Sequence, residues 1–465
     1  MNFILASASL TRCHALKCAG LDFDTVSAKI DEENISRALL SDKTPHREIA
    51  DTLAEYKAKK ISNKWPESLV LGCDQILSLG DQIIEKPYSL AELRENLKKI
   101  SGKRHQLVTA NVIYKERNPV WRHIAVSSLT MVSMNSQEID DLSQQSWNKA
   151  QHNSANYCFE EIPYMFLDVR GNWFDILGVS VNEIVNFINQ NNYTPKARAP
   201  KVVALLGSPV SHSKSPLMHK HWLSKNKISG DYVAIDVPKK KLSNAVRVLT
   251  SVGLSGFNVT LPHKQEALII ANKKTRTAKK IGAVNCVAKS KGYNTDWIGF
   301  KNSMVVNDID LKNKNCIILG AGGAARAVAY ALIKSECDTI TIINRSEKRK
   351  KAILQWIEGF GNYSANIDKG DIIINCTPVG MWPNLENKPI YKGTISSKQV
   401  VVDTIYNPYE TAFLKHAKKA GAKIVSGLDM FIQQGLASIN IWEDNNISQR
   451  VNVNNVKKVL EEKLC

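Results

Sequence analysis

Two short polar stretches in the C-terminal half of this 465-residue sequence carry side chains that could move a proton. Lys264 ends the stretch GFNVTLPHK, and Asp296 lies within YNTDWIG. Reduction of a ketone by a hydride donor needs a cation or acid beside the carbonyl oxygen, where an alkoxide develops. The ammonium of Lys264 could stabilise that alkoxide and donate the proton, while Asp296 orients the ammonium and hydrogen-bonds a substrate hydroxyl. We predict that Lys264 and Asp296 are a catalytic pair.

The stretch CIILGAGGAARAVAYALIK predicts a dinucleotide site near this pair. It reads as a buried parallel strand, a glycine turn and a helix whose N-terminus can face a pyrophosphate. A tight turn without a ligand is the alternative, and the strand before and the helix after the glycines favour the cofactor. The predicted cofactor contacts are Gly320, Ala321, Gly322, Gly323 and Ala324.

The end of the next predicted strand indicates which dinucleotide binds. Proteins that bind NAD usually have an Asp or Glu there for the ribose 2′-hydroxyl, whereas this chain has Asn344, Arg345 and Ser346, followed by Arg349. Guanidinium groups can bind a 2′-phosphate through charge-assisted hydrogen bonds that a carboxylate would oppose. These four residues therefore favour NADP(H) over NAD.

A second group of charged residues lies in the N-terminal half. The serine-rich turn in ILASASLTR could offer hydroxyl and backbone N–H groups to phosphate. Hydrolysis between the α- and β-phosphates of a nucleotide needs cations, a metal held by carboxylates and a base for water. Arg12, Lys57 and Lys86 fit the first need. Asp74 fits a general base or metal ligand, and Glu32 or Asp31 fits a further ligand for Mg or Mn.

The elements that must position these residues are of α/β type throughout. Strand and helix patterns alternate on both sides of the polar stretch from Asn189 to Lys201, which reads as a linker. The length suggests two or three domains. We predict an N-terminal mixed α/β domain (1–190), a linker (191–200), an α/β substrate domain (201–300), a doubly wound Rossmann domain (301–427) and C-terminal helices that return to the substrate domain (428–465).

The C-terminal motifs GSPVSHSKSP, GFNVTLPHK, GAVNCV, YNTDWIG, NCTPVGM and GLDMFIQQG together resemble shikimate dehydrogenase of aromatic amino acid biosynthesis. The resemblance implies NADPH-dependent, reversible reduction of 3-dehydroshikimate to shikimate in chorismate biosynthesis. It also gives Lys264 and Asp296 the catalytic roles argued above. The substrate contacts that it implies are Ser213, Ser215, Asn258, Thr260, Asn285, Tyr406 and Gln434. Quinate as main substrate, or NAD as main cofactor, is the less favoured alternative.

The N-terminal motifs SASLTR, IDEE, LAEYKAKK, LGCDQIL, EKP and SGKRHQLVTA resemble the Maf-like nucleoside triphosphate pyrophosphatases. That resemblance implies release of pyrophosphate from a nucleotide at Asp74, with a divalent metal. Gln75 and Glu161 are similar to the branch that acts on 7-methyl-GTP, and a carboxylate suits the N–H donors of a guanine edge. The segment around Asn156 and Glu161 departs from the family pattern through loss of glycine. A nucleotide-binding or assembly module without turnover is therefore the alternative for this half.

Composition restricts the partners. The net charge is +18, but the lysines and arginines are spread along the chain without an aromatic-interleaved pattern, so we expect no nucleic acid partner. No apolar run is long enough for a membrane span. The nine cysteines contain no CxxC pair, and we expect reduced thiols, mostly in cores, rather than metal ligands. We expect a cytoplasmic protein with small-molecule substrates and leave a homodimer open.

Overall fold

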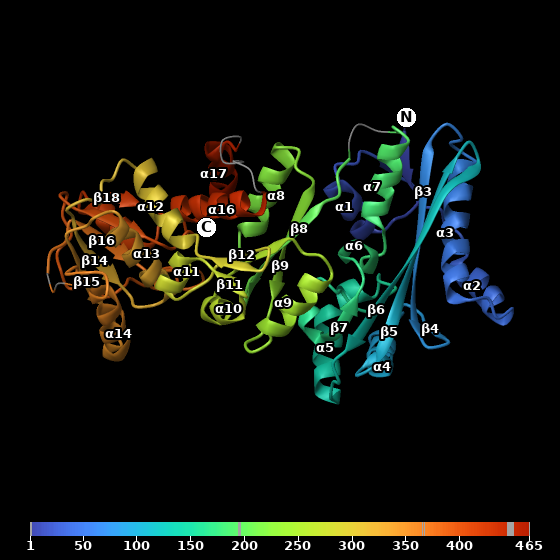
Figure 1. Cartoon of the computed structure of the whole chain (residues 1–465), viewed down its shortest axis with the longest axis horizontal. Coiled ribbons are helices and arrows are strands. Elements are labelled where there is room, and N and C mark those ends of the chain that lie inside the picture. The colour runs from blue at the N-terminus through green and yellow to red at the C-terminus, as the bar shows by residue number, and fades with distance from the viewer. Residues whose placement is uncertain (1, 194–196, 365, 367, 444–450, 465) are drawn as a thin grey trace. The chain divides into compact units, whose positions relative to one another are not determined.

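The computed structural model describes residues 2–193, 197–364, 366, 368–443 and 451–464, so three positions of the predicted linker, 194–196, lie outside the described residues. The chain forms two compact units (Figure 1). Unit 1 contains residues 1–204 and 223–255, and unit 2 contains residues 205–222 and 256–465. Within the described ranges, no helix is long and apolar enough to cross a membrane, and no cysteine forms a disulfide.

The first sheet is mixed, in the order β2-β1-β3-β5-β6-β7 with β4 on β3. Its strands are β1 (Phe3–Leu5), β2 (Asp24–Thr25), β3 (Leu69–Leu79), β4 (Gln82–Ile84), β5 (Arg104–Lys115), β6 (Asn118–Met131) and β7 (Phe166–Arg170). The helical segments are α1 (Leu10–Cys18), α2 (Glu32–Ser41), α3 (His46–Ser62), α4 (Leu90–Ile100), α5 (Ser136–Ala150), η1 (Pro163–Met165), α6 (Trp173–Ile176) and α7 (Val181–Gln190). Apolar residues of α3 pack on β3 and β5 and form one core, which fixes Lys57 of α3 beside Asp74 of β3.

The second sheet has the order β11-β13-β12-β10-β8-β9. Its strands are β8 (Lys201–Gly207), β9 (Gly230–Asp236), β10 (Gly256–Val259), β11 (Lys273–Lys274), β12 (Cys286–Ala288) and β13 (Lys291–Tyr293). The helices in this part of the chain are α8 (Ser215–Lys225), α9 (Leu242–Ser251), α10 (Lys264–Ile270), α11 (Arg276–Ile281) and α12 (Asp296–Val306). Lys264 and Asp296 are each the first residue of a helix, α10 and α12 respectively.

The third sheet is parallel throughout, in the order β15-β14-β16-β17-β18. Its strands are β14 (Asn315–Leu319), β15 (Thr339–Ile343), β16 (Ile372–Asn375), β17 (Val400–Asp403) and β18 (Lys423–Val425). The helices are α13 (Gly323–Lys334), α14 (Glu347–Glu358), α15 (Ala412–Lys419), α16 (Gly427–Glu443) and α17 (Val453–Glu461). Ile318 packs in one core and Ile317 in another, because both faces of the sheet are covered. The predicted doubly wound α/β fold is confirmed.

Candidate active sites

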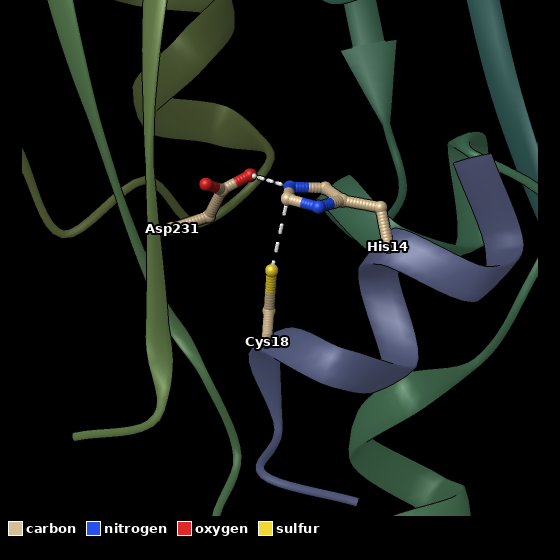
Figure 2. Close-up of side chains that lie close together, drawn as sticks. All are labelled: His14, Cys18 and Asp231. Atoms are coloured by element: carbon tan, nitrogen blue, oxygen red, sulfur yellow. Dashed lines mark hydrogen bonds and ion pairs between the residues drawn. The ribbon is translucent and has the colours of Figure 1, made fainter. Parts of the chain in front are cut away.

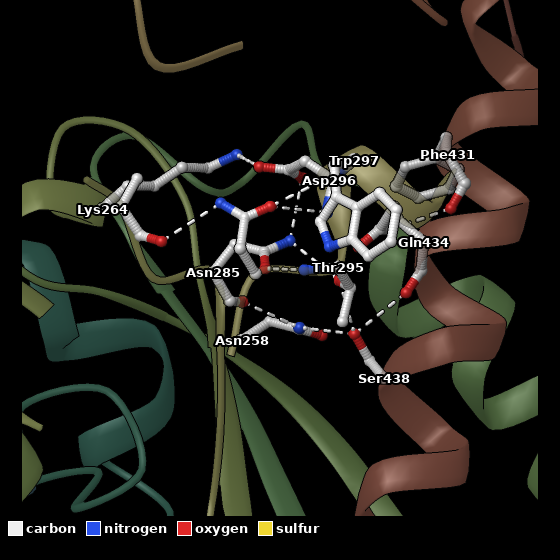
Figure 3. Close-up of polar contacts among 11 residues, drawn as sticks. Asn258, Lys264, Asn285, Thr295, Asp296, Trp297, Phe431, Gln434 and Ser438 are labelled. Atoms are coloured by element: carbon white, nitrogen blue, oxygen red, sulfur yellow. Dashed lines mark hydrogen bonds and ion pairs between the residues drawn. The ribbon is translucent and has the colours of Figure 1, made fainter. Parts of the chain in front are cut away.

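Lys264 and Asp296 meet in unit 2 as predicted (Figure 3). The Lys264 Nζ donates to Asp296 Oδ2 at 2.7 Å, and their side chains are 19% and 10% exposed. Partial burial strengthens this ion pair relative to one in open solvent, while the remaining exposure leaves access for a substrate. The arrangement can hold an ammonium beside a reacting oxygen.

A buried polar network fixes the carboxylate of this pair. Asn285 Nδ2 donates to Asp296 Oδ1 at 2.8 Å and to Thr295 Oγ1 at 2.9 Å, and the Thr295 backbone N–H donates to Asn285 Oδ1 at 2.6 Å. Asn258 Nδ2 donates to the Asn285 carbonyl and to Ser438 Oγ, each at 3.0 Å. Thr295 and Ser438 were missed in the sequence, although Thr295 lies in the YNTDWIG motif and Ser438 lies one helical turn beyond Gln434.

Helix α16 brings Gln434 to the same region (Figure 3). A Cβ atom at Gly299 of α12 would lie 2.7 Å from Gln434 Cβ and 2.8 Å from the Met430 carbonyl oxygen. The two helices can therefore approach this closely only with glycine at that position. Gln434 is half-buried, and its Nε2 donates to the Phe431 carbonyl at 2.8 Å within α16.

The predicted carboxylate-binding residues lie at the start of α8. Ser213 Oγ donates to Ser215 Oγ at 3.3 Å and accepts from the Ser215 backbone N–H at 3.2 Å. The Tyr406 ring stacks on Phe431 at 4.2 Å between centroids, and burial raises the pKa of the Tyr406 hydroxyl. Thr260 directly follows β10, where its backbone N–H donates to the Leu206 carbonyl. Ser213 and Ser215 thus form one linked pair of hydroxyls.

The glycine turn after β14 has the geometry of a dinucleotide loop. Gly320 has a φ of +113°, and a Cβ there would lie 3.1 Å from Thr377 Cγ2, so the position favours glycine. Added Cβ atoms at Gly322 and Gly323 would meet nothing within 4 Å, and no side chain caps α13. The first N–H groups of α13 therefore lack a side-chain cap, and the space beside the two glycines is open, which suits a pyrophosphate.

The residues predicted to select the cofactor lie next to this turn. The Gly320 backbone N–H donates to the Ile343 carbonyl at 2.8 Å, which joins the glycine turn to the end of β15. Asn344 Nδ2 donates to the Ser346 carbonyl at 2.9 Å, and Ser346 caps α14 by accepting from the Arg349 backbone N–H at 3.4 Å. Arg345 and Arg349 are exposed. Their guanidinium groups are thus available to an anion beside the turn.

In unit 1, Asp74 and Lys57 form a second buried ion pair. Lys57 Nζ donates to Asp74 Oδ1 at 2.5 Å and lies 3.0 Å from Glu32 Oε1, with Lys57 7% and Asp74 5% exposed. Asp31 instead caps α2 by accepting from the Asn34 backbone N–H, so Glu32 is the acidic residue that shares Lys57 with Asp74. Asp74 and Glu32 both lie beside the ammonium of Lys57. A pair of carboxylates suits Mg²⁺ or Mn²⁺, because such an ion binds one or two carboxylates together with substrate phosphates.

Cationic and polar groups surround this pair. Arg12 Nη1 donates to the Cys73 carbonyl at 2.8 Å, next to Asp74, and Ser9 caps α1. Lys86 is exposed. Gln75 Nε2 donates to Thr109 Oγ1 and to the carbonyls of residues 175 and 176, at 2.9 to 3.2 Å. The amide nitrogen of Gln75 is therefore occupied by hydrogen bonds within the protein, and the amide oxygen is the group that a ligand could bind.

The segment that departs from the Maf-like pattern retains a defined geometry. Asn156 is fully buried with a φ of +63°, a conformation that glycine adopts readily and that Asn tolerates. Its Nδ2 donates to the Glu85 carbonyl at 3.2 Å, which holds the loop that carries Lys86. The predicted base-reading residue Glu161 is ion-paired with Lys149, with a 37% exposed side chain. The neighbouring Glu160 has a buried Oε2 without a hydrogen-bond partner among the described residues, and burial raises its pKa.

Comparisons with known proteins match both halves of the chain. Residues 2–191 match the model of Maf-like proteins, residues 205–287 that of the shikimate dehydrogenase substrate binding domain, and residues 303–405 that of shikimate / quinate 5-dehydrogenase. The shikimate dehydrogenase (NADP(+)) of Caldanaerobacter subterraneus subsp. tengcongensis is 40% identical over 255 residues, which are 52% of this chain and 91% of that protein.

Two solved structures are similar to the C-terminal part. A shikimate dehydrogenase in complex with NADP+ is 38% identical, with 57% of this chain and 96% of that chain covered and a TM-score of 0.53. Shikimate 5-dehydrogenase from Thermus thermophilus, in complex with NADP(H) and shikimate, is 31% identical, with 57% and 100% covered and a TM-score of 0.51. Both resemblances noted in the sequence are confirmed at the level of family.

Proposed function

We propose that this chain, which belongs to the shikimate dehydrogenase family and carries a Maf-like domain before that part, reduces 3-dehydroshikimate to shikimate with NADPH and hydrolyses a nucleoside triphosphate at a second site. The observation that carries the first activity is the 2.7 Å contact between Lys264 Nζ and Asp296 Oδ2, held in place by Asn285. The names of the related enzymes and the NADP complexes of the similar structures support it.

The ion pair explains how this chain handles the proton. NADPH, when bound, supplies the hydride to the carbonyl carbon. The ammonium of Lys264 stabilises the negative charge that develops on the carbonyl oxygen and donates one proton to it. Asp296 keeps the ammonium directed at that oxygen, and in the oxidation direction the neutral amine of Lys264 accepts the proton back. Asn285 prevents the Asp296 carboxylate from rotating away.

The remaining polar groups orient the substrate and the cofactor. We assign Ser213 and Ser215 to the substrate carboxylate, because their hydroxyls are hydrogen-bonded to each other at the start of α8, and we assign Tyr406 to the substrate from its place in the family motif. We assign four other side chains to hydrogen bonds with the ring hydroxyls of the substrate: Asn258, Thr260, Asn285 and Gln434. The pyrophosphate of NADP(H) would lie at the N-terminus of α13, and its 2′-phosphate against Arg345 and Arg349.

The first test replaces Lys264 with alanine. We expect loss of shikimate oxidation with NADP by a factor on the order of 10² to 10⁴, because the proton acceptor is removed. Lys279→Ala, which removes an exposed lysine from α11, is the matched control and should keep full activity. Circular dichroism checks the fold of both variants. Full activity in Lys264→Ala would refute the catalytic role, and quinate measured in parallel decides between the two substrates.

The second activity rests on Asp74, Lys57 and Glu32 in unit 1. A bound Mg²⁺ or Mn²⁺ would neutralise the triphosphate, and Asp74 and Glu32 would hold that ion. Arg12, Lys57 and Lys86 bind phosphate oxygens as cations. Asp74 also accepts a proton from the attacking water, once substrate binding draws Lys57 toward the phosphates. The products are a nucleoside monophosphate and pyrophosphate.

We further propose 7-methyl-GTP as the nucleotide. A carboxylate in the segment after Asn156 accepts hydrogen bonds from the guanine N–H groups, and its charge favours the cationic methylated base. Glu161 is the residue indicated by the sequence, and Glu160 is the carboxylate with the buried unpaired oxygen. Comparison of Glu160→Gln with Glu161→Gln identifies the base-reading residue, because only that variant should lose preference for 7-methyl-GTP over dTTP.

Pyrophosphate release tests the hydrolytic activity directly. The wild-type chain is incubated with Mg²⁺ or Mn²⁺ and a panel that contains 7-methyl-GTP, GTP, dTTP and UTP. We expect release that is greatest with 7-methyl-GTP and that Asp74→Asn abolishes. Binding without release from any nucleotide would refute the hydrolase and favour the non-catalytic module, while the dehydrogenase assay in the same protein shows that the preparation is folded.

A further inference from the structure

Three side chains that the two proposed activities do not use converge in unit 1 (Figure 2). They are His14 and Cys18 of α1 and Asp231 of β9. The His14 Nε2 lies 2.7 Å from Asp231 Oδ2 and 3.5 Å from Cys18 Sγ. One ligand atom from each residue lies within 4.8 Å of the other two. In the part of the chain that the structure describes, this is the one cluster of three or more residues of metal-ligating type.

One of the separations matches that of a tetrahedral zinc site, and a second requires a small movement. Zinc–nitrogen and zinc–sulfur bonds of about 2.05 and 2.3 Å place the nitrogen and sulfur ligands about 3.5 Å apart at the tetrahedral angle. The observed separation of His14 Nε2 and Cys18 Sγ is 3.5 Å. Nitrogen and oxygen ligands lie about 3.4 Å apart in the same geometry, so the Asp231 oxygen would have to move away from His14 by about 0.7 Å.

The position of the cluster suits a bound metal ion. Cys18 and Asp231 are 9% and 6% exposed, whereas the side chain of His14 is 51% exposed. A buried thiol and a buried carboxylate beside a more accessible imidazole provide both a low-dielectric environment and an entry path for a metal ion. His14 and Cys18 are four residues apart on one helix and therefore lie on the same face of α1.

We propose that His14, Cys18 and Asp231 bind one zinc ion, which links helix α1 to strand β9. The Cys18 thiol loses its proton to the solvent on binding, the imidazole binds as the neutral ring, and Asp231 binds as the carboxylate. Water completes the tetrahedron. The mixed nitrogen, sulfur and oxygen set favours zinc over magnesium or manganese, which prefer oxygen ligands. The proposal differs from the expectation from the sequence that the cysteines are reduced thiols rather than metal ligands.

The proposed ion is separate from the predicted nucleotide site. Arg12 lies on the same helix and points to the Cys73 carbonyl. At about 100° per residue, His14 and Cys18 are roughly 160° and 120° around α1 from Arg12, so the two groups occupy different faces. A zinc ion at His14 would therefore fix the helix without contact with the triphosphate. A simple hydrogen bond from His14 to Asp231 is the alternative explanation of the contact.

Cobalt and zinc titrations of the full chain separate these explanations. Metal-free protein is titrated with Co²⁺ in excess Mg²⁺, which occupies the carboxylate site near Asp74. We expect one Co²⁺ per chain, with a thiolate-to-cobalt charge-transfer band in the near ultraviolet that one equivalent of Zn²⁺ removes. Cys18→Ser should abolish the band, whereas Cys13→Ser, on the same helix, should leave it unchanged.

Asp231→Asn provides a second readout if Cys18→Ser fails to fold. Asparagine retains the oxygen that accepts from the Tyr232 backbone N–H at 2.8 Å but removes the charge. We expect this variant to keep the charge-transfer band and to bind zinc on the order of 10- to 100-fold more weakly. The proposal is overturned if no zinc is bound at equimolar concentration or if the charge-transfer band survives in Cys18→Ser. It is also overturned if Cys13→Ser loses the band to the same extent as Cys18→Ser.

Discussion

Replacement of Arg345 should change the choice between NADP and NAD without loss of the chemical step. Arg345 and Arg349 are both exposed, so each charge-assisted contact with a 2′-phosphate is weakened by solvent to about 1 to 1.5 kcal/mol. Arg345→Ala should therefore lower kcat/KM for NADP about five- to twelve-fold. Arg345→Asp adds repulsion from a phosphate of charge near −2. The total loss is then about 3 kcal/mol, or about 150-fold.

The assay is initial-rate oxidation of shikimate with each cofactor at saturating shikimate. NAD has no 2′-phosphate, so its kcat/KM should stay within about twofold of the wild-type value in both variants. Lys348→Ala is the matched control, because it removes an exposed positive charge from the same first turn of α14. Equal losses with NADP and NAD, or an equal loss in Lys348→Ala, would show that Arg345 acts through general charge or through the fold.

Three further outcomes follow from particular contacts. Lys264→Arg keeps the cation beside Asp296 but has a pKa above about 12, so kcat should fall at least about 100-fold while KM for shikimate changes little in steady-state assays. Asn156→Ala should lower the urea unfolding free energy by about 2 to 3 kcal/mol through strain and a lost hydrogen bond. Asn156→Gly should lose only the part of the unfolding free energy that comes from the hydrogen bond, because glycine adopts this φ without strain. Burial lowers the pKa of His219 to about 3, so between pH 6.5 and 3 the unfolded chain binds a proton that the folded chain does not. Stability should fall with decreasing pH by up to about 1.4 kcal/mol per unit, and His219→Leu should flatten that slope in urea titrations at several pH values.

The fold was predictable where local signals determine it. The run CIIL before Gly320 is apolar at every position because β14 is covered on both faces, and the glycines after it require a turn. The same signals located the glycine turn after β14 and the end of β15. The meeting of Lys264 with Asp296 was also predictable, because the motifs GFNVTLPHK and YNTDWIG occur together with the glycine motif.

Residues that act through distant partners were not predictable in this way. Ser438 has no local signal, since its role depends on the approach of α16 to Asn258. Glu160 and Glu161 are neighbours of the same type, and only the structure separates the buried oxygen from the ion pair with Lys149. Asp231 is likewise far in sequence from His14 and Cys18.

The hydrogen bond from Asn258 to Ser438 also sets an order for biosynthesis of the chain. The ribosome releases residues from the N-terminus, so the first sheet and the pair of Lys264 with Asp296 can form while later residues are still being added. The hydrogen bond from Asn258 to Ser438 can form only after α16 has left the exit tunnel. The polar network around Lys264 and Asp296 is therefore complete only after α16 has been synthesised, long after the residues around Asp74.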